Sequence, residues 1–172
     1  MKVLRVNNEQ LAKQAEEFIF TALKPGGFSH DESIPLPNLK DKLAWLSWAN
    51  LMRYEQPSLV VIDDDEIVGG MFGEPVETTF DEGEAEIQHP VVFNPGIETE
   101  ELAFRMLTQM MDFYQQNDAK QVHFWVLEDD LKRNNFKPWQ QVAVDRFGFE
   151  FKGFKRISKW RNKPVCKIQK YF

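Results

Sequence analysis

Cysteine is almost absent from this sequence. The single residue, Cys166, cannot form an internal disulfide, a pattern typical of a reducing cytoplasm. No cysteine or histidine pair stands at the spacing of zinc ligands, and the acidic run 63–66 lacks the alternating ligands of a calcium loop, so we predict no metal site. Cys166 also has no histidine near it in the sequence, which argues against a Cys–His nucleophile.

Long apolar runs are also missing. No segment approaches the roughly 20 apolar residues that span a bilayer. The polar residues that follow the first few positions are unlike the apolar core of a signal peptide. We therefore expect a cytoplasmic protein without a membrane segment.

An excess of positive charge is missing from the chain as a whole. The 21 basic and 27 acidic residues give a net charge of −6, which argues against broad nucleic-acid binding. The charge is uneven, however, because residues 151–172 contain eight lysines and arginines and no acid. This part of the predicted basic C-terminal hairpin, 149–172, has two interpretations. It is a contact surface for a protein partner, or its lysines protect an exposed sheet edge.

Repeats and low-complexity tracts are absent, so the chain is interpreted as a single domain over 1–172. Apolar residues recur at strand spacing and at helical spacing in turn, which predicts an α/β fold. Strands are expected at 2–6, 58–62, 67–73, 84–93, 121–127, 149–159 and 164–172. Helices are expected at 9–23, 39–54, 99–117 and 137–146, with Asn7 or Asn8 and Thr99 as N-caps. Residues 24–38 form a long loop of a kind that is often functional or mobile.

The strand at 84–93 contains a proline, which a regular central strand does not tolerate. Pro90 therefore predicts either a bulge or an opened edge at this point. His89 lies at the predicted bulge, and Glu86 lies on the opposite face of the strand. Both side chains can accept a proton near neutral pH, so both are candidate general bases.

The stretch 139–151 reads WQQVAVDRFGFEF. It predicts a helix that Gly148 ends in a left-handed turn before Phe149 begins a strand. This Gly-Phe pair, with the order strand, two helices, hairpin, strand, helix, strand, helix, strand, strand, resembles the GNAT family of N-acetyltransferases. The resemblance covers roughly residues 1–165 as an element order. It implies a mixed, mostly antiparallel sheet with helices on both faces.

The resemblance also implies a set of functional residues. Acetyl-CoA would lie between the strands at 84–93 and 121–127. Its acyl group and pyrophosphate would meet backbone groups of six residues: Val91, Val92, Phe93, Asn94, Gly96 and Thr99. The acceptor would be a small amine, a protein N-terminus or a lysine, entering beside 24–38 and 39–54. Glu86 or His89 would take its proton.

Two positions depart from the family pattern. The tyrosine that often serves as general acid lies four residues before the glycine, and here that residue is Val144, which cannot donate a proton. The phosphate-binding segment, 94–101, has one glycine and a proline without an N–H group, together with three glutamates. Each close contact between a glutamate and a phosphate would cost on the order of 1 kcal/mol. An ordinary capped helix with acids in its first turn explains this segment better.

These departures predict a degenerate, non-catalytic binding or structural protein on an acyltransferase scaffold. The alternative is an active N-acetyltransferase that uses acetyl-CoA. A protein partner would contact the basic hairpin or the helix at 39–54. A cleft blocked by Trp125 or Phe93 would favour the binding protein, whereas an open cleft with free N–H groups at 94–99 would favour the enzyme. Small divergent proteins of this kind occur in tailed phages, and if the chain is phage-encoded the expected location is the host cytoplasm or a virion.

Overall fold

The computed structural model describes residues 1–53, 55–77 and 83–172, with the backbone alone at residues 88–90. In these residues the chain forms seven strands, which make one sheet, and six helices. The strands are β1 (Lys2–Arg5), β2 (Ser58–Asp63), β3 (Glu66–Gly73), β4 (Glu84–Phe93), β5 (Gln121–Leu127), β6 (Glu150–Ile157) and β7 (Pro164–Tyr171). The helices are α1 (Glu9–Leu23), α2 (Leu36–Trp45), α3 (Trp48–Leu51), α4 (Glu100–Gln116), α5 (Glu128–Lys132) and α6 (Pro138–Phe147).

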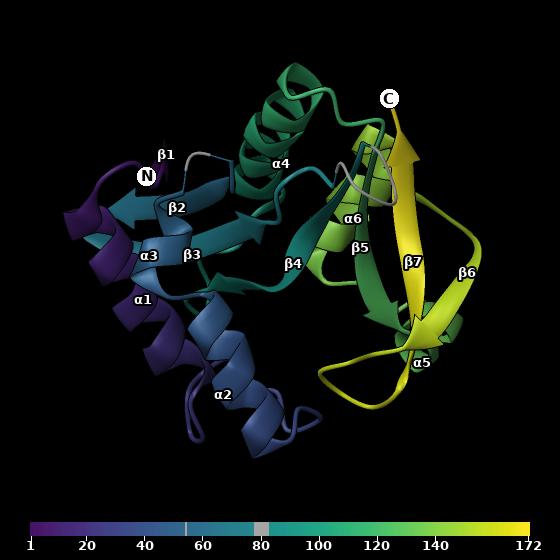
Figure 1. Ribbon diagram of the computed structural model, residues 1–172, viewed down its shortest axis with the longest axis horizontal. Coiled ribbons are helices and arrows are strands. Elements are labelled where there is room, and N and C mark those ends of the chain that lie inside the picture. The colour runs from purple at the N-terminus through teal and green to yellow at the C-terminus, as the bar shows by residue number, and fades with distance from the viewer. Residues whose placement is uncertain (54, 78–82) are drawn as a thin grey trace.

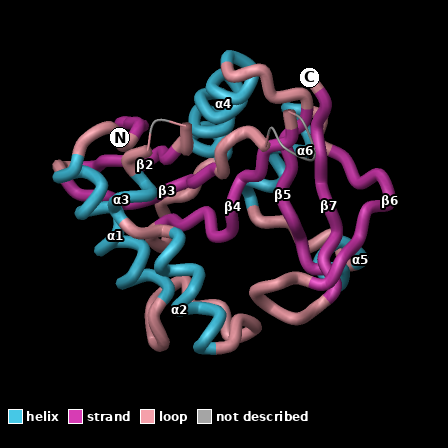
Figure 2. The backbone as a smooth tube through the Cα atoms, viewed as in Figure 1, coloured by secondary structure: helices cyan, strands magenta, loops and turns pink. Residues whose placement is uncertain are grey.

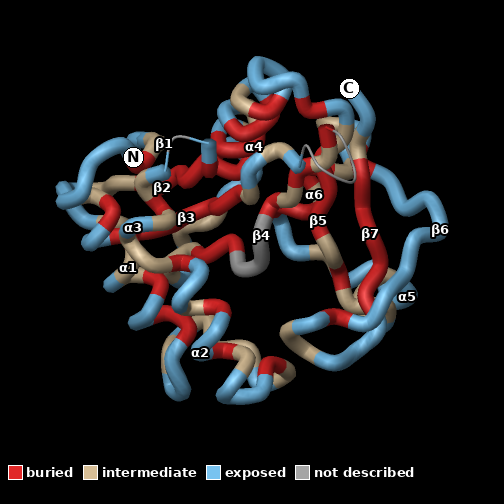
Figure 3. The backbone as a smooth tube through the Cα atoms, in the orientation of Figure 1, coloured by how far each residue is buried: buried red, intermediate tan, exposed pale blue. Residues whose placement is uncertain are grey.

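The sheet is mixed and mostly antiparallel, as predicted. Its strand order is β1-β2-β3-β4-β5-β7-β6, and β4 and β5 are the parallel pair among the described strands. β7 lies between β5 and β6 although it follows both of them in the chain (Figure 1). β6 is therefore an outer strand, and all of its residues are exposed while most of β7 is buried (Figure 3).

Helices cover both faces of the sheet, which confirms the predicted architecture (Figure 1). Successive side chains of a strand point to opposite faces, so each strand serves two cores. On β2, Leu59 and Val61 pack with side chains of α4 and α6, whereas Val60 packs with side chains of α1 and α2. Among the described residues, no helix combines the length and the apolarity that crossing a membrane requires.

The predicted helix ends are confirmed at three places. The Asn8 side chain accepts a hydrogen bond from the Leu11 N–H at 2.9 Å and begins α1. Thr99 Oγ1 accepts one from the Leu102 N–H at 3.1 Å and begins α4. Gly148 ends α6 with φ 75°, a left-handed conformation that costs a residue without a Cβ little.

The predicted loop at 24–38 and helix at 39–54 are wrong in their boundaries. α2 already begins at Leu36, because Pro37 lacks an N–H and its fixed φ suits the first helical turn. The loop therefore covers residues 24–35 (Figure 2). The sequence analysis also omitted α5, a single short helix directly after β5.

The helix expected at 39–54 is in fact two helices with a break between them (Figure 2). The Asn50 side-chain amide donates to the Trp45 carbonyl at 3.1 Å and satisfies the end of α2. The Trp48 N–H at the start of α3 donates to a carboxylate oxygen of Glu16, on α1, at 2.7 Å. The break is therefore stabilised by a residue more than thirty positions away, which a local helix pattern does not contain.

The backbone of β4 is bulged at the predicted place. Gly70 pairs with Val92 and Phe72 pairs with Gln88, so one residue of β3 lies opposite three residues of β4. The extra residues include Pro90, which cannot donate to the ladder. This confirms the bulge, which increases the twist of β4 and bends it locally.

Candidate functional site

β4 and β5 run side by side over a short distance only. Their parallel pairing joins Glu84–Glu86 to Gln121–His123, and the two strands then diverge (Figure 1). Beyond this point the facing edges of the strands do not bond to each other. The side chains at the point of divergence therefore border an opening in the middle of the sheet.

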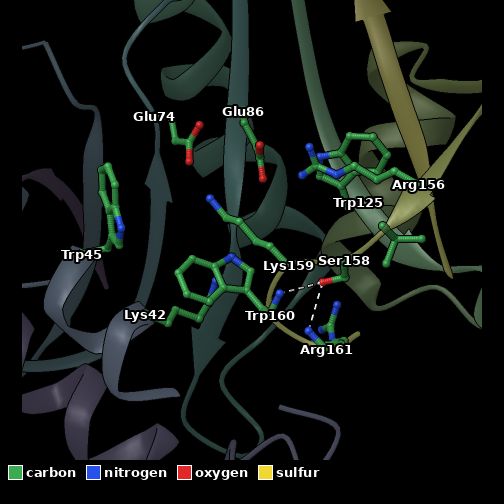
Figure 4. A pocket seen from close by; sticks show the side chains of 11 residues that line it. Lys42, Trp45, Glu74, Glu86, Trp125, Arg156, Ser158, Lys159, Trp160 and Arg161 are labelled. Atoms are coloured by element: carbon green, nitrogen blue, oxygen red, sulfur yellow. Dashed lines mark hydrogen bonds between the residues drawn. The ribbon is translucent and has the colours of Figure 1, made fainter. Parts of the chain in front are cut away.

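A cleft of about 780 Å³ lies at this opening. Its lining residues belong to the segment after β3 and to the strands β4, β5, β6 and β7, and they include Trp45 of α2. A much smaller pocket, of about 30 Å³, adjoins it between α2 and the β6–β7 connection (Figure 4). An Asp31–Arg161 ion pair at 3.0 Å and a hydrogen bond from Asn38 to the Trp160 carbonyl at 2.9 Å hold the N-terminal segment against this connection.

A histidine and two carboxylates form the centre of the cleft. His123, which is 5% exposed, has Nδ1 3.1 Å from Glu84 Oε1 and Nε2 3.4 Å from Glu86 Oε2. The contact at Nδ1 is an ion pair rather than a well-formed hydrogen bond, because its geometry falls outside that of a hydrogen bond. Lys167 of β7 pairs with the same Glu84 oxygen. His123 of β5 and Lys167 of β7 thus compensate the negative charge of Glu84 on β4.

These contacts shift the pKa values of the three groups. Burial alone would lower the pKa of His123, but its contacts with Glu84 and Glu86 outweigh burial and raise it. His123 and Lys167 lower the pKa of Glu84 from its usual 4.5 to about 2. Burial raises the pKa of Glu86, yet His123 and the charges of Arg156 and Lys159 leave it below its usual value. The contacts therefore favour the imidazolium form of His123 between two carboxylates.

A third carboxylate, Glu74, lies beside Glu86, and its pKa is shifted in the opposite direction. Burial, and then the charge of Glu86, raise the pKa of Glu74. Tyr114 of α4 contacts the backbone of both residues. Its hydroxyl donates to the Glu74 carbonyl at 2.7 Å and lies 3.1 Å from the Glu86 carbonyl. Figure 4 shows both carboxylates directed into the pocket. Two neighbouring acids with pKa values pushed apart can hold and exchange one proton.

Aromatic and basic side chains form the remaining walls. The guanidinium of Arg156 lies 3.9 Å from the ring centre of Trp125, and Lys159 Nζ lies 4.9 Å from that of Trp160 (Figure 4). Trp45 is 51% exposed and stands on the side opposite Trp125. The acids therefore lie deep between aromatic rings, while the basic groups stand around the opening.

The predicted bases have different outcomes. Glu86 lines the cleft, and its role as a base stays a prediction. The side chain of His89 lies outside the described residues, so its role as a base stays a prediction. Val91 and Val92 are buried in the cores on opposite faces of the sheet. Phe93 packs over Gly69 of β3, where an added Cβ would lie 2.8 Å from its ring.

Two backbone N–H groups in the segment before α4 already donate to carbonyls of the chain itself. The Asn94 N–H donates to the Val68 carbonyl at 2.8 Å, and the Ile97 N–H donates to the Asn94 carbonyl at 3.1 Å. Gly96 is exposed with φ 82°, and Thr99 caps the helix. The chain itself thus uses the Asn94 and Ile97 donors, and the first turn of α4 adds the acids Glu100 and Glu101.

Glu98 occupies the start of the neighbouring helix. Its carboxylate accepts a hydrogen bond from the Trp139 N–H at 2.9 Å and so caps α6. Burial raises the pKa of Glu98. A carboxylate thus bridges the two helix starts, α4 and α6, on the side where the strands separate. These residues fit the pyrophosphate of CoA poorly, since an anion would compete with Glu98 and meet Glu100 and Glu101.

Two residues that the sequence did not single out, His123 and Lys42, contribute to the site together with Trp125, which was expected at the cleft. His123 is the partner of Glu86 in the β4–β5 register, and the strand alternation puts Trp125 on its face. Lys42 of α2 lines the small pocket and is 2% exposed. A signal for Lys42 was present, because it lies on the stripe of Leu39 and Leu46, where an apolar residue is expected.

Comparison with known proteins connects this geometry to one fold. No family model and no curated protein sequence matches the chain. An acetyltransferase of the GNAT family from Desulfovibrio desulfuricans aligns with a TM-score of 0.65 and 11% identity over 99% of this chain and 98% of that one. An aminoglycoside 6′-N-acetyltransferase complexed with coenzyme A aligns with a TM-score of 0.62 and 13% identity over 99% of this chain and 97% of that one. The ribosomal-protein-alanine N-acetyltransferase of Brucella melitensis aligns with a TM-score of 0.59 and 15% identity over the whole of both chains.

The class of protein is therefore defined by its fold. It is a mixed α/β fold with a seven-stranded sheet, a split between β4 and β5 and a bulge in β4. More particularly, the fold is that of the GNAT acetyltransferases, as the Gly-Phe motif and the element order predicted. Identities this low establish the fold, and the activity has to be argued from the site.

Proposed function

We propose that the protein is a non-catalytic binding protein whose cleft recognises a primary amine with an anionic group close to it. The observation that carries this proposal is the contrast between the two ends of the site. The cleft is lined by the half-buried carboxylates of Glu74, Glu84 and Glu86 and by the rings of Trp45 and Trp125. The cofactor end is bridged by Glu98, which caps α6 with the charge that a phosphate would bring.

The charges of the cleft support a ligand of both signs. An ammonium group fits beside Glu74 and Glu86, because carboxylates and aromatic faces both attract cations. Arg53, Arg156 and Lys159 border the same cleft and suit an anionic group of the ligand. A polycation would meet these three basic groups without compensation.

The binding proposal is tested with the dipeptide aspartylglycine, its N-acetylated form and the polycation spermidine, by calorimetric titration. We expect the free dipeptide to bind at least tenfold more tightly than the other two, because a charge-assisted hydrogen bond contributes about 1.5–3 kcal/mol. Glu86→Gln should remove the preference, whereas Glu66→Gln, at an exposed position of β3, should keep it. Equal affinity for the free and acetylated dipeptides, or no binding of either, would contradict the proposal.

An active N-acetyltransferase is the second candidate, and the pair Glu74 and Glu86 favours it. Glu86, with its lowered pKa, stays ionised beside a bound amine, and Glu74, with its raised pKa, is the stronger base of the two and the better suited to take the proton of that amine. Titration with acetyl-CoA, and with desulfo-CoA as a second ligand, decides between the candidates. Micromolar affinity supports the enzyme, and an amine screen with Glu86→Gln follows. No heat at millimolar ligand supports the binding protein.

A protein partner at the basic hairpin stays part of the proposal. The outer strand β6 exposes Phe154 at 62% and Ile157 at 63% beside its basic residues. Lys155 is tied to Glu128 of α5 at 2.6 Å, so part of this charge is already used within the chain. Both interpretations of the hairpin, partner contact and protection of the sheet edge, fit this surface.

A further inference from the structure

Lys42 stands at a position where a lysine is unusual. It lies on α2 three residues after Leu39 and four before Leu46, on the face of the helix that packs into the core. Its side chain is 2% exposed, whereas its neighbours Lys40 and Asp41 on the same helix are exposed. Lysines are almost never this deeply buried unless they are paired.

The surroundings of the Lys42 amine give it little compensation. Its Nζ lies 4.7 Å from the ring centre of Trp160, and among the described residues no carboxylate lies within ion-pair distance of it. Burial is the largest effect and lowers the pKa of Lys42 to about 7. The charged groups around it act in both directions.

Two acids and two cations face the Lys42 amine. Glu86 of β4 and Glu74 after β3 raise its pKa, while Arg161 and Lys159 of the β6–β7 connection lower it. The charged groups around the amine thus belong to β4, to the segment after β3 and to the β6–β7 connection. The charges therefore leave burial as the effect that decides.

The amine is buried but not sealed. Lys42 lines the small pocket together with Trp160 and Glu86, and that pocket shares Trp45, Glu86 and Trp125 with the open cleft. Figure 4 shows Lys42 entering from α2 beside Trp160. A volume of about 30 Å³ holds one or two water molecules, so a reagent that reaches the amine has to be small.

We propose that Lys42 is a nucleophilic amine that accepts a small acyl group from an activated donor entering the pocket. The Nζ lone pair attacks the acyl carbon, a C–N bond forms, and the bond from that carbon to the leaving oxygen or sulfur breaks. The leaving group departs with the electron pair. The displaced Nζ proton passes to water in the pocket. The product is a neutral amide that can no longer be protonated to an ammonium.

This inference goes beyond the proposed function, because the acceptor is the protein itself. A lysine with a pKa of about 7 is about half unprotonated at neutral pH. An ordinary lysine is unprotonated at roughly one part in a thousand or less at that pH. The expected gain in available nucleophile is therefore roughly a thousandfold, reduced by the narrow entrance.

Trace labelling of the native protein with acetic anhydride tests the inference. The extent of labelling of each lysine is measured by mass spectrometry over a series of pH values from neutral to strongly alkaline. We expect Lys42 to reach half of its maximal labelling near pH 7, and labelling of exposed Lys40 on the same helix is the control for the activity of the reagent. Lys42 left unlabelled while Lys40 reacts, or a Lys42 midpoint near the ordinary lysine value of about 10.4, would overturn the proposal.

A variant provides a second measurement. Since Glu86 raises the pKa of Lys42, Glu86→Gln should move the midpoint of Lys42 labelling to lower pH, while Glu66→Gln should leave it in place. A midpoint that moves equally in both variants would mean that the pocket charges do not act on Lys42. Neither measurement uses CoA or an added amine, so this inference and the proposed function can fail separately.

Discussion

Replacing Glu84 by glutamine removes the charge that His123 and Lys167 share, at nearly unchanged volume. The fall in the pKa of Glu84 from 4.5 to about 2 corresponds to about 3 kcal/mol of stabilisation at full strength. Its side chain keeps 18% of its exposure, so water screens part of this interaction. We therefore expect Glu84→Gln to lower the free energy of unfolding by roughly 1–2 kcal/mol at neutral pH.

The loss should depend on pH in a defined direction. A carboxylate with a lowered pKa stabilises the fold above its unfolded pKa and loses that effect as the pH falls towards 2. His123, whose pKa is raised, gives its stabilisation at low pH and loses it as the pH rises through its folded pKa. The difference between Glu84→Gln and the native chain should therefore be largest between the ordinary pKa of a glutamate and the raised pKa of His123.

Urea unfolding of both proteins at a series of pH values measures this difference. Glu66→Gln is the matched control, because it removes the same charge at an exposed position. We expect the control to follow the native chain at every pH, and the effect of Glu84→Gln to shrink as the solution becomes acidic. A loss of equal size at all pH values would mean that Glu84 contributes by packing, and the charge argument would be refuted.

Two further predictions concern the supports of the site. Tyr114→Phe should lower the free energy of unfolding by about 1–2 kcal/mol in urea, because the carbonyl of Glu74 loses its hydroxyl donor; an unchanged midpoint would contradict this. Glu98→Ala should cost about 1 kcal/mol and speed hydrogen exchange of the Trp139 amide, since α6 loses its cap, and unchanged exchange would count against the bridge.

Much of the fold could be predicted because the signals are local. Asn8 and Thr99 begin their helices, Gly148 ends one, and Pro90 marks the bulge, each through the geometry of a few neighbouring residues. The break between α2 and α3 could not be predicted, because the carboxylate that satisfies it belongs to Glu16 of another helix. A local pattern of apolar residues contains no information about such a partner.

The site was predictable in part for a similar reason. Glu86 could be proposed from the alternation of its own strand. The importance of His123 depends on the register between β4 and β5, and that of Lys42 on the approach of α2 to the β6–β7 connection. Glu98 was expected to oppose a phosphate at α4, whereas its carboxylate caps α6 instead. These facts arise from contacts between distant segments and have no counterpart in local spacing.

The place of β7 inside the sheet has a consequence for how the protein is made. β5 has no antiparallel neighbour until residues 164–171 are synthesised, since it is β7 that pairs along its whole length. A ribosome that has just completed β6 therefore carries a chain whose central strand is open on one side. This half of the domain can assemble only when β7 inserts between two strands that were made before it. Arrest or cleavage just before Pro164 should leave an aggregation-prone intermediate.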